Sequence, residues 1–494
     1  MLWAIMIIGI FAIFAIWPKR TSGPHGGKGK GKDVPRPLRG SWVTREEQGR
    51  RLWKEELRER ELDPSGLVPF GGGYILPEAE MQHVKIVGTT GSGKSTAIRH
   101  LLAQVERRPT QRCVIVDPDG GYARLFFDPV RGDRIINPFD ARTSGWDLAS
   151  DVQEDYEARH LAAALIPDTS GESGEWRSYA QTLTAAVILA LRARGELTVE
   201  ALYHAVVLTS DADLGELVVG SPAARFWGKD NERMRNSIRS VAATALAGLS
   251  HVQSGNLSLS EYARGDDRGW LFLPYQAPQI AELRGVISAW MRIAIFSLMS
   301  RAEGDSGTWL IIDELDSLGK ISGLTDALPR LRKFGGRCVL AFQSIGPLTE
   351  IYGHGFSGAV IENASNTLIL RCSDSGERSG GTARFASSLI GQREVMRTTS
   401  STSETQGSSL QHGLRIAPGT NRSKVAGTNT APVVEPAVLP AQIEGLENLQ
   451  GYVHSHGTGW WSRCTLPIFE REQKAEAFVP RAARGATAEE SEDE

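Results

Sequence analysis

The 494-residue sequence is poor in cysteine and has no large excess of charge of either sign. Its four cysteines, Cys113, Cys338, Cys372 and Cys464, form no C-x-x-C pair and no spacing typical of a metal site, so they fit reduced thiols in a cytosolic body. The formal net charge is −3, which leaves no global electrostatic footprint for nucleic acid. There is no internal repeat, and the length is enough for about three domains.

The first seventeen residues, MLWAIMIIGIFAIFAIW, lack any charged side chain. As a helix they would be about 25 Å long, slightly short of a hydrocarbon core of roughly 30 Å. Lys and Arg are frequent immediately after this run, whereas a cleavable signal peptide places its positive charge before it. The sequence therefore predicts an uncleaved, single-pass anchor over residues 1–18, with the bulk of the chain in the cytoplasm. A buried N-terminal core helix is the alternative.

Three further segments show little sign of packing. Residues 19–66 are predicted to be a basic juxtamembrane linker that can lie on anionic lipid. Residues 397–432 are rich in Ser, Thr and Gly and are predicted to form a long surface loop. Residues 476–494 end in ATAEESEDE and are predicted to be an acidic, disordered tail, which either keeps the protein soluble or binds a basic partner.

A glycine-rich turn lies between a strand pattern and a helical pattern in KIVGTTGSGKSTAIRHLLAQ, residues 85–104. It fits G-x-x-x-x-G-K-[ST] without a gap. In this motif backbone N–H groups surround the β-phosphate, the lysine reaches the β/γ oxygens, and the final hydroxyl ligates Mg²⁺. The sequence therefore predicts nucleotide binding by Gly88, Thr89, Thr90, Gly91, Ser92, Gly93, Lys94, Ser95 and Thr96, with Lys94 also catalytic and Ser95 a metal ligand.

A second chemical signal is TWLIIDELDSL, an apolar strand that ends in Asp313 and Glu314. Strand ends of a parallel sheet meet at one edge, so this pair is expected beside the phosphate loop. Asp313 would hold the Mg²⁺ shell, and Glu314 would polarise the attacking water. The next strand ends at Gln343, which is expected near the γ-phosphate. Between them lies DALPRLRKFGGR, whose basic residues form either a solvated helix face or a source of an arginine donated across a subunit boundary.

Strand and helix patterns alternate through most of the chain. The alternation stops between residues 152 and 262, where only helical patterns occur, and then resumes. This arrangement predicts an α/β fold: a doubly wound, mainly parallel sheet with an inserted all-α domain, preceded by a transmembrane helix. The predicted boundaries are 67–151 and 263–475 for the two parts of the nucleotide-binding domain and 152–262 for the all-α domain.

Four stretches together resemble the TraD/TrwB-like type IV coupling proteins of bacterial conjugation: HVKIVGTTGSGKST, DPDGGY with INPFDARTSGWDL, WLIIDELDSL and GGRCVLAFQSIGPLTEIYG. The resemblance spans residues 70 to 470 with the motifs in order. It implies a RecA-like, DNA-dependent ATPase that uses ATP and Mg²⁺, forms a hexamer and is anchored in the bacterial inner membrane. The implied partners are single- and double-stranded DNA, relaxase and relaxosome proteins, and components of the type IV secretion channel.

The resemblance also assigns residues. Asp313 and Glu314 match the family's Walker B pair, Gln343 matches its motif glutamine, and Arg332 falls where the family has its trans-acting arginine. Lys94 matches the lysine of the phosphate loop. Relatives often have two membrane spans, whereas this sequence shows one, which puts contact with periplasmic channel parts in question.

Two functions of different class remain open on sequence. In one, the chain is an ATP-hydrolysing pump that moves DNA. In the other, it is a membrane receptor for relaxase or other protein substrates, and ATP binding only switches assembly. An ATPase that assembles the secretion channel is a third possibility. Arg124, Arg131 and Arg134 are candidates for contact with DNA in a pore, and exposed loop arginines are the alternative.

Overall fold

The computed structural model describes residues 34, 36–167, 173–228, 230–304, 307–353, 355, 358, 362–374, 381–408 and 420–481. The predicted anchor over residues 1–18 and residues 482–494 of the predicted tail lie outside these ranges. The chain divides into residues 1–34 and a compact unit from Pro35 to Glu494, and the description below concerns the second unit. None of the helices in the described ranges combines the length and the apolar character that a membrane span requires.

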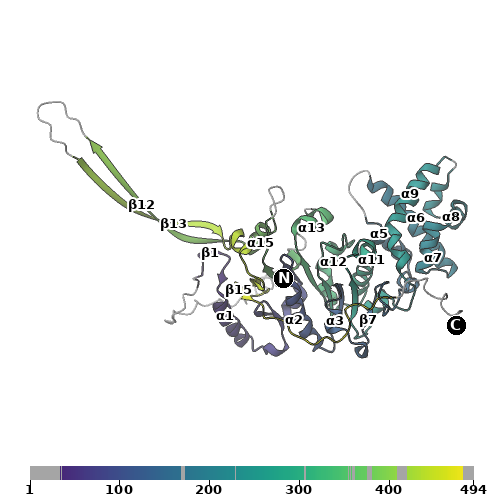
Figure 1. The fold of residues 1–494 in the computed structure, drawn as a ribbon, viewed down its shortest axis with the longest axis horizontal. Helices are drawn as coiled ribbons and strands as arrows, with labels where there is room; N and C mark the ends of the chain where they lie inside the picture. Colours follow the sequence, from purple (N-terminus) through teal and green to yellow (C-terminus); the bar gives the residue numbers. More distant parts are fainter. Residues whose placement is uncertain are drawn as a thin grey trace, which may run out of the picture. The chain divides into compact units, whose positions relative to one another are not determined.

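The centre of this unit is a sheet of ten strands in the described ranges (Figure 1). In spatial order the strands are β2 (Val43–Thr44), β15 (Trp461–Thr465), β14 (Gln450–His454), β11 (Asn366–Leu370), β5 (Val84–Val87), β10 (Gly336–Phe342), β9 (Thr308–Ile312), β6 (Arg112–Pro118), β8 (Leu271–Tyr275) and β7 (Arg134–Ile135). The strands from β11 to β7 are all parallel, whereas β14 is antiparallel to both of its neighbours. The predicted mainly parallel sheet is thus confirmed.

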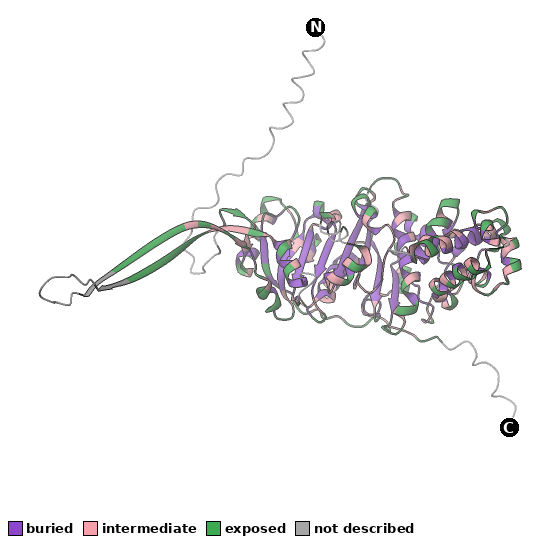
Figure 2. Cartoon of the chain, turned by 90° about the horizontal axis from the view of Figure 1, so that it is seen from above, coloured by how far each residue is buried: buried purple, intermediate pink, exposed green. Residues whose placement is uncertain are grey.

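Side chains on alternate positions of each strand enter two separate cores, one on each face of the sheet. In β9, Trp309 and Ile311 belong to one core and Leu310 and Ile312 to the other. All of these residues are almost completely buried, as expected for strands that are apolar along their whole length. Figure 2 shows this buried centre as a continuous set of strands covered by helices.

Helices cover both faces of the sheet (Figure 1). Side chains of α1 (Glu46–Glu59), α2 (Lys94–Glu106) and α3 (Ala123–Phe126) pack into one core. The opposite core receives α11 (Ile280–Leu298), α12 (Leu324–Leu331), α13 (Ile345–Tyr352), α15 (Thr382–Ile390) and α16 (Pro440–Glu444). Because both faces are covered, the arrangement is doubly wound, as predicted.

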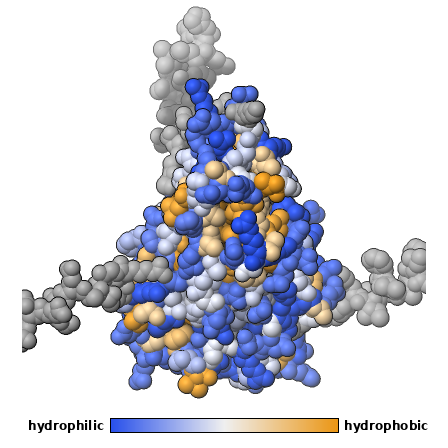
Figure 3. All heavy atoms as spheres, turned by 90° about the vertical axis from the view of Figure 1, so that its right-hand side faces the viewer, coloured by the Kyte–Doolittle hydropathy of each residue, from blue (hydrophilic) through white to orange (hydrophobic). Residues whose placement is uncertain are grey.

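Between β7 and β8 the described residues form helices and no strand of the sheet. These helices are α4 (Leu148–Asp151), α5 (Asp155–Leu165), α6 (Ser173–Arg194), α7 (Val199–Tyr203), α8 (Asp211–Leu217), α9 (Glu232–Leu246) and α10 (Leu259–Arg264). Their apolar side chains continue the core that also receives α11. Figure 3 shows the side on which these helices lie, where apolar side chains gather near the middle of a largely polar surface.

Two predicted unstructured segments are folded instead. Within the predicted linker of residues 19–66, residues 39–66 contain β1 (Arg39–Gly40), β2 and α1, and Trp53 of α1 is buried against Tyr74 at a ring distance of 6.0 Å. Tyr74 belongs to a small hairpin formed by β3 (Val68–Phe70) and β4 (Gly73–Ile75). The prediction of a linker relied on the Lys and Arg content of this segment. The segment instead contains an amphipathic helix, which presents its charged face to solvent.

The predicted loop at residues 397–432 lies in a long hairpin of β12 (Gln392–Ser408) and β13 (Thr420–Pro436). The two strands pair in register from Gln392 opposite Pro436 to Ser408 opposite Thr420, and their described side chains are mostly exposed (Figure 2). The prediction was wrong because it equated the absence of a packed core with the absence of structure. Here backbone pairing between strands rich in β-branched Thr and Val replaces core packing.

Candidate active site

The phosphate-loop motif lies at the carboxyl end of β5, a central strand of the sheet. The loop is tied to both neighbouring strands, because Gly88 N donates to Phe342 O at 3.3 Å and Thr89 N donates to Arg371 O at 2.8 Å. Gly93 ends the loop with φ of 118°, and a Cβ at this position would lie 2.9 Å from Leu449 Cδ2. A left-handed backbone in this confined space requires glycine. The helix α2 begins at the next residue, so its N-terminus faces the loop.

Lys94 is buried at the centre of this loop. Its Nζ donates to Gly88 O at 2.8 Å and to Thr89 O at 3.2 Å. Burial lowers the pKa of Lys94, and the nearby carboxylates of Asp313 and Glu314 oppose that shift. The ammonium group thus lies between the loop carbonyls and the acidic pair, where it can meet an incoming phosphate.

Asp313 directly follows β9 and is the acidic residue that contacts the loop directly. Its Oδ2 accepts hydrogen bonds from Ser95 Oγ at 2.8 Å and from Tyr122 Oη at 2.7 Å. Its Oδ1 is buried and has no hydrogen-bond partner among the described residues. A buried carboxylate oxygen without a partner is costly, so this atom marks a place for a cation or its water. Ser95 and Asp313 supply the oxygen ligands that Mg²⁺ prefers.

Glu314, Gln343 and Thr90 form a line of hydrogen bonds beside Asp313. Gln343 donates from Nε2 to Glu314 Oε1 at 2.9 Å and accepts at Oε1 from Thr90 Oγ1 at 2.7 Å. Glu314 has φ of 67°, a left-handed conformation that is strained for a non-glycine residue and is typical of functional sites. Burial, followed by the charges of Asp313 and Asp316, raises the pKa of Glu314. A raised pKa improves this carboxylate as a proton acceptor.

Tyr122 is the site residue that sequence reasoning missed. It follows β6, and its backbone N–H donates to both oxygens of Asp117 at 2.9 and 3.1 Å, while its phenol reaches Asp313. Burial raises the pKa of Asp117 to about 7, and the hydrogen bonds from Tyr122 and Ala123 oppose this shift. Tyr122 ends the stretch DPDGGY, which carried part of the family resemblance, so the signal was present although no role was assigned to it.

Arg332 does not join the other predicted residues. It lies exposed after α12, in the short turn Arg332–Phe334 that precedes β10. Gln343 follows the opposite end of β10, and a seven-residue strand of Gly336–Phe342 separates the two by about 20 Å. The structure therefore brings together Lys94, Ser95, Asp313, Glu314 and Gln343, and it leaves Arg332 at the other edge of the sheet.

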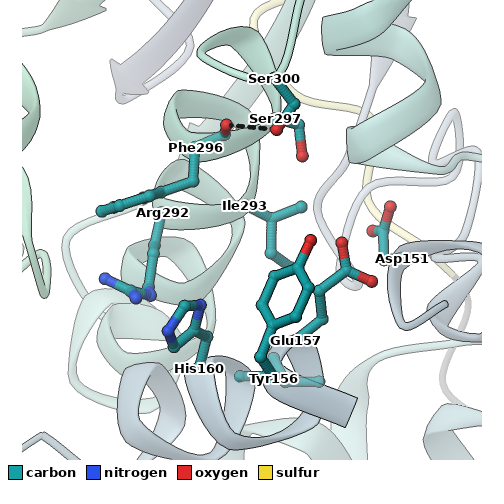
Figure 4. Close-up of a pocket in the computed structure, with 10 residues that line it drawn as sticks. Asp151, Tyr156, Glu157, His160, Arg292, Ile293, Phe296, Ser297 and Ser300 are labelled. Atoms are coloured by element: carbon teal, nitrogen blue, oxygen red, sulfur yellow. Dashed lines mark hydrogen bonds between the residues drawn. The ribbon is translucent and has the colours of Figure 1, made fainter. Parts of the chain in front are cut away.

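A cavity of 120 Å³ lies between α5 and α11 (Figure 4). Arg292 of α11 lies in it, stacked 4.3 Å over Phe296, and donates from Nη1 to Ser322 O at 2.6 Å. Ser322 directly precedes Gly323, the residue that caps α12. Arg292 therefore fixes the start of the helix that ends beside Arg332.

The family model for the type IV secretion-system coupling protein DNA-binding domain matches residues 69–465. The chain belongs to this family. Coupling protein TraD of Escherichia coli (strain K12) is 28% identical over 426 residues, which cover 84% of this chain and 56% of TraD. The chain thus spans little more than half the length of that relative.

Solved structures of the plasmid coupling protein TrwB show the same fold. TrwB in complex with the non-hydrolysable ATP analogue ADPNP is 27% identical, with a TM-score of 0.74, and the match covers 92% of this chain and 100% of the solved TrwB chain. TrwB in complex with ADP and Mg²⁺ is also 27% identical, with a TM-score of 0.75 and coverage of 93% and 100%. The resemblance to TraD/TrwB-like coupling proteins is confirmed.

Of the three arginines proposed to contact DNA, Arg131 is engaged inside the fold. It pairs with Asp133 at 2.6 Å and lies 4.1 Å over the ring of Trp270. These contacts argue against DNA contact by Arg131. Arg124 and Arg134 remain predictions.

A groove of 700 Å³ in this coupling protein is lined by side chains that suit contact with DNA better than Arg131 does. It lies where the helical region meets the loop that follows Glu314. Arg284 of α11, Lys320 of that loop and Trp176 of α6 line it, and none of the lining residues in the described part of the chain is a carboxylate.

Proposed function

We propose that this chain is a membrane-anchored, ATP-driven motor that couples a relaxase–DNA complex to a type IV secretion channel during conjugative transfer. The observation that carries the proposal is the convergence of Lys94, Ser95, Asp313, Glu314 and Gln343 at one sheet edge in a member of the coupling-protein family. A receptor that only binds nucleotide does not need an oriented proton acceptor. The Gln343–Glu314 pair supplies one.

In this proposal ATP binds at Gly88–Thr96 with its phosphates against the loop amides and Lys94. Relatives solved with an ATP analogue and with ADP and Mg²⁺ support this choice of nucleotide and ion. Ser95 and Asp313 hold the Mg²⁺, which neutralises charge on the phosphate oxygens. Tyr122 positions Asp313 by donating to Oδ2, the oxygen that Ser95 also contacts.

Hydrolysis then requires a water in line with the γ-phosphorus. Glu314 accepts its proton as the new P–O bond forms and the bond to the ADP oxygen breaks. Gln343 holds the Glu314 carboxylate and, through Thr90, senses the phosphate loop. These hydrogen bonds thus connect the place where the γ-phosphate binds to Glu314, the residue that activates water.

Arg332 completes the site from a neighbouring copy. Its position about 20 Å from Gln343 in the same chain excludes a role in its own pocket. An exposed arginine at an edge of the subunit can reach the pocket of the next subunit in a ring, and we propose a hexamer on this basis together with the family. Such an arginine stabilises charge on the transferring phosphoryl group.

DNA is proposed to contact the groove beside the Glu314 loop. Arg284 and Lys320 supply positive charge, and Trp176, which is 37% exposed, supplies a ring on which a base can stack. Replacing Arg284 and Lys320 together by Ala should lower stimulation of hydrolysis by single-stranded DNA and leave the basal rate unchanged. Undiminished stimulation in that variant would place the DNA elsewhere.

The proposal is tested with Lys94→Ala in the full-length protein. The variant should abolish conjugative transfer and ATP turnover while membrane association is kept. Lys54→Ala, which removes an exposed lysine of α1, is the matched control and should transfer normally. Normal transfer by Lys94→Ala would overturn the motor and favour a receptor that another ATPase serves.

A further inference from the structure

A polar bay of 530 Å³ opens beside the phosphate loop. Five of the residues that line it carry hydroxyl groups, and the other two are Gln343 and Arg371. Among the residues that the structure describes, no carboxylate lines the bay, and Arg371 is the one cation beside lining side chains that are neutral and mostly carry hydroxyl groups. This composition suits an anion with several oxygens, because hydroxyl and guanidinium groups both donate hydrogen bonds.

The backbone of Arg371 is fixed to the loop at two points. β11 pairs in parallel with β5 so that Ile369 lies opposite Val87, and Arg371 therefore lies alongside the start of the loop. Its carbonyl oxygen accepts from Thr89 N at 2.8 Å and from Thr89 Oγ1 at 3.1 Å. Any shift of the loop must move Arg371 with it.

The surroundings of Arg371 leave its side chain available to bind a ligand. The residue is half-buried, and its guanidinium makes no hydrogen bond or ion pair with the described residues around it. The nearest strand-end acids are already engaged: Gln343 holds Glu314, and Ser95 and Tyr122 hold Asp313. A half-buried arginine beside a phosphate loop, with no carboxylate partner among the described residues, is suited to bind phosphate.

The position of the bay indicates that it binds the terminal phosphate of the nucleotide. Thr90 and Gln343 line it, and the same two residues form the hydrogen-bonded line that ends at Glu314. Glu314 is the residue placed to activate water at the γ-phosphorus. The bay therefore lies at the γ end of the loop, whereas Lys94 spans the β and γ oxygens.

We infer that Arg371 is a phosphate-binding residue supplied in cis, which contacts the γ-phosphate of the bound triphosphate and has no contact with the diphosphate product. This inference rests on the proposed function, since it assumes that the loop binds a nucleoside triphosphate. It gives the site a group in the same chain that distinguishes triphosphate from diphosphate, separate from the arginine donated by a neighbour.

Affinity for two nucleotides tests the inference. The dissociation constants of the non-hydrolysable ATP analogue ADPNP and of ADP, each with Mg²⁺, are measured by calorimetry on full-length protein. Arg371→Ala should weaken binding of ADPNP by about 10- to 100-fold, the loss expected for a charge-assisted hydrogen bond, and change ADP binding by less than about twofold. Arg371→Lys keeps the charge without the planar fork and should fall between the wild type and Arg371→Ala.

Arg107→Ala is the matched control, because Arg107 is exposed at the far end of α2 from the loop, and it should bind both nucleotides as the wild type does. Equal weakening of ADPNP and ADP in Arg371→Ala would show that Arg371 supports the loop as a whole, and no change in either would show that it does not meet the nucleotide. Both results overturn the inference. Failure of the proposed function is distinguished by conjugative transfer, since normal transfer by Lys94→Ala would overturn the motor whatever Arg371→Ala does to nucleotide binding.

Discussion

Gln343 and Glu314 are joined by a hydrogen bond of 2.9 Å. The amide of Gln343, which directly follows β10, donates to the carboxylate of Glu314, which lies just after β9. The same amide accepts from Thr90 of the phosphate loop at 2.7 Å. The two strands are parallel neighbours, so the contact follows from the sheet order. It gives the loop a direct connection to Glu314, the residue that we propose activates water.

Replacing Gln343 with Leu should therefore lower kcat for ATP hydrolysis by about 100-fold, the lower range for losing one preorganised donor in an active site. Nucleotide binding should stay within about twofold, because the loop and Lys94 are intact. Steady-state kinetics and a binding titration separate the two effects. A loss of binding with an unchanged kcat would contradict the role assigned to Gln343.

Tyr122→Phe should raise the Mg²⁺ concentration required for half-maximal hydrolysis by about 10-fold. The phenol donates to Asp313 at 2.7 Å, and loss of such a positioning contact typically costs 10- to 100-fold in metal affinity. Tyr262→Phe removes another buried phenol, which donates to Gly269 O at 2.8 Å away from the site, and its Mg²⁺ requirement should equal that of the wild type. Equal behaviour of the two variants would remove Tyr122 from the metal site.

Arg332→Ala should reduce hydrolysis by the assembled protein about 1,000-fold, the lower range for loss of an arginine that acts on the phosphoryl group. Mixing it with Lys94→Ala subunits should restore part of the activity. At some interfaces an intact loop from one variant then meets an intact arginine from the other. A mixture as inactive as its two components would refute donation between subunits.

Asp117 makes the stability of the protein depend on pH. Its pKa in the folded protein is about 7, above the ordinary 3.8, because the carboxyl group is fully buried. The folded state therefore binds the proton more tightly than the unfolded state, and its stability falls as pH rises toward 7, by up to about 4 kcal/mol.

Asp117→Asn cannot ionise and should lack this contribution. The melting temperature of the variant relative to wild type should accordingly rise between pH 5 and pH 8. Thermal melts of both proteins at the two values measure the difference. A constant offset across this range would show that Asp117 is ionised throughout.

The local parts of the site follow from the sequence, and the long-range contacts do not. The loop from Gly88 to Ser95 is a contiguous motif whose spacing is set by the phosphates, so its function could be predicted from the residues alone. The places of Asp313 and Gln343 could be predicted because each comes directly after an apolar strand. The roles of Tyr122 and Arg371 depend on which strands are neighbours in the sheet. The sequence alone does not give the order of the strands.

The hairpin of β12 and β13 illustrates a different limit. Its polar composition indicated a loop, because strand patterns are normally recognised by an apolar face. The structure pairs the two segments with each other over their whole length, so no apolar face is required. The prediction for residues 39–66 was wrong for a similar reason. The basic residues of this segment indicated a linker, although α1 carries an apolar stripe that includes the buried Trp53.

The most direct test is the rate of ATP hydrolysis by purified full-length protein in detergent with Mg²⁺, measured with and without single-stranded DNA and alongside the mass of the assembly. The account predicts a ring-sized oligomer whose hydrolysis is stimulated by DNA and is lost in Lys94→Ala. A protein that stays monomeric with DNA and nucleotide present, and whose rate responds to neither DNA nor Lys94→Ala, would contradict it.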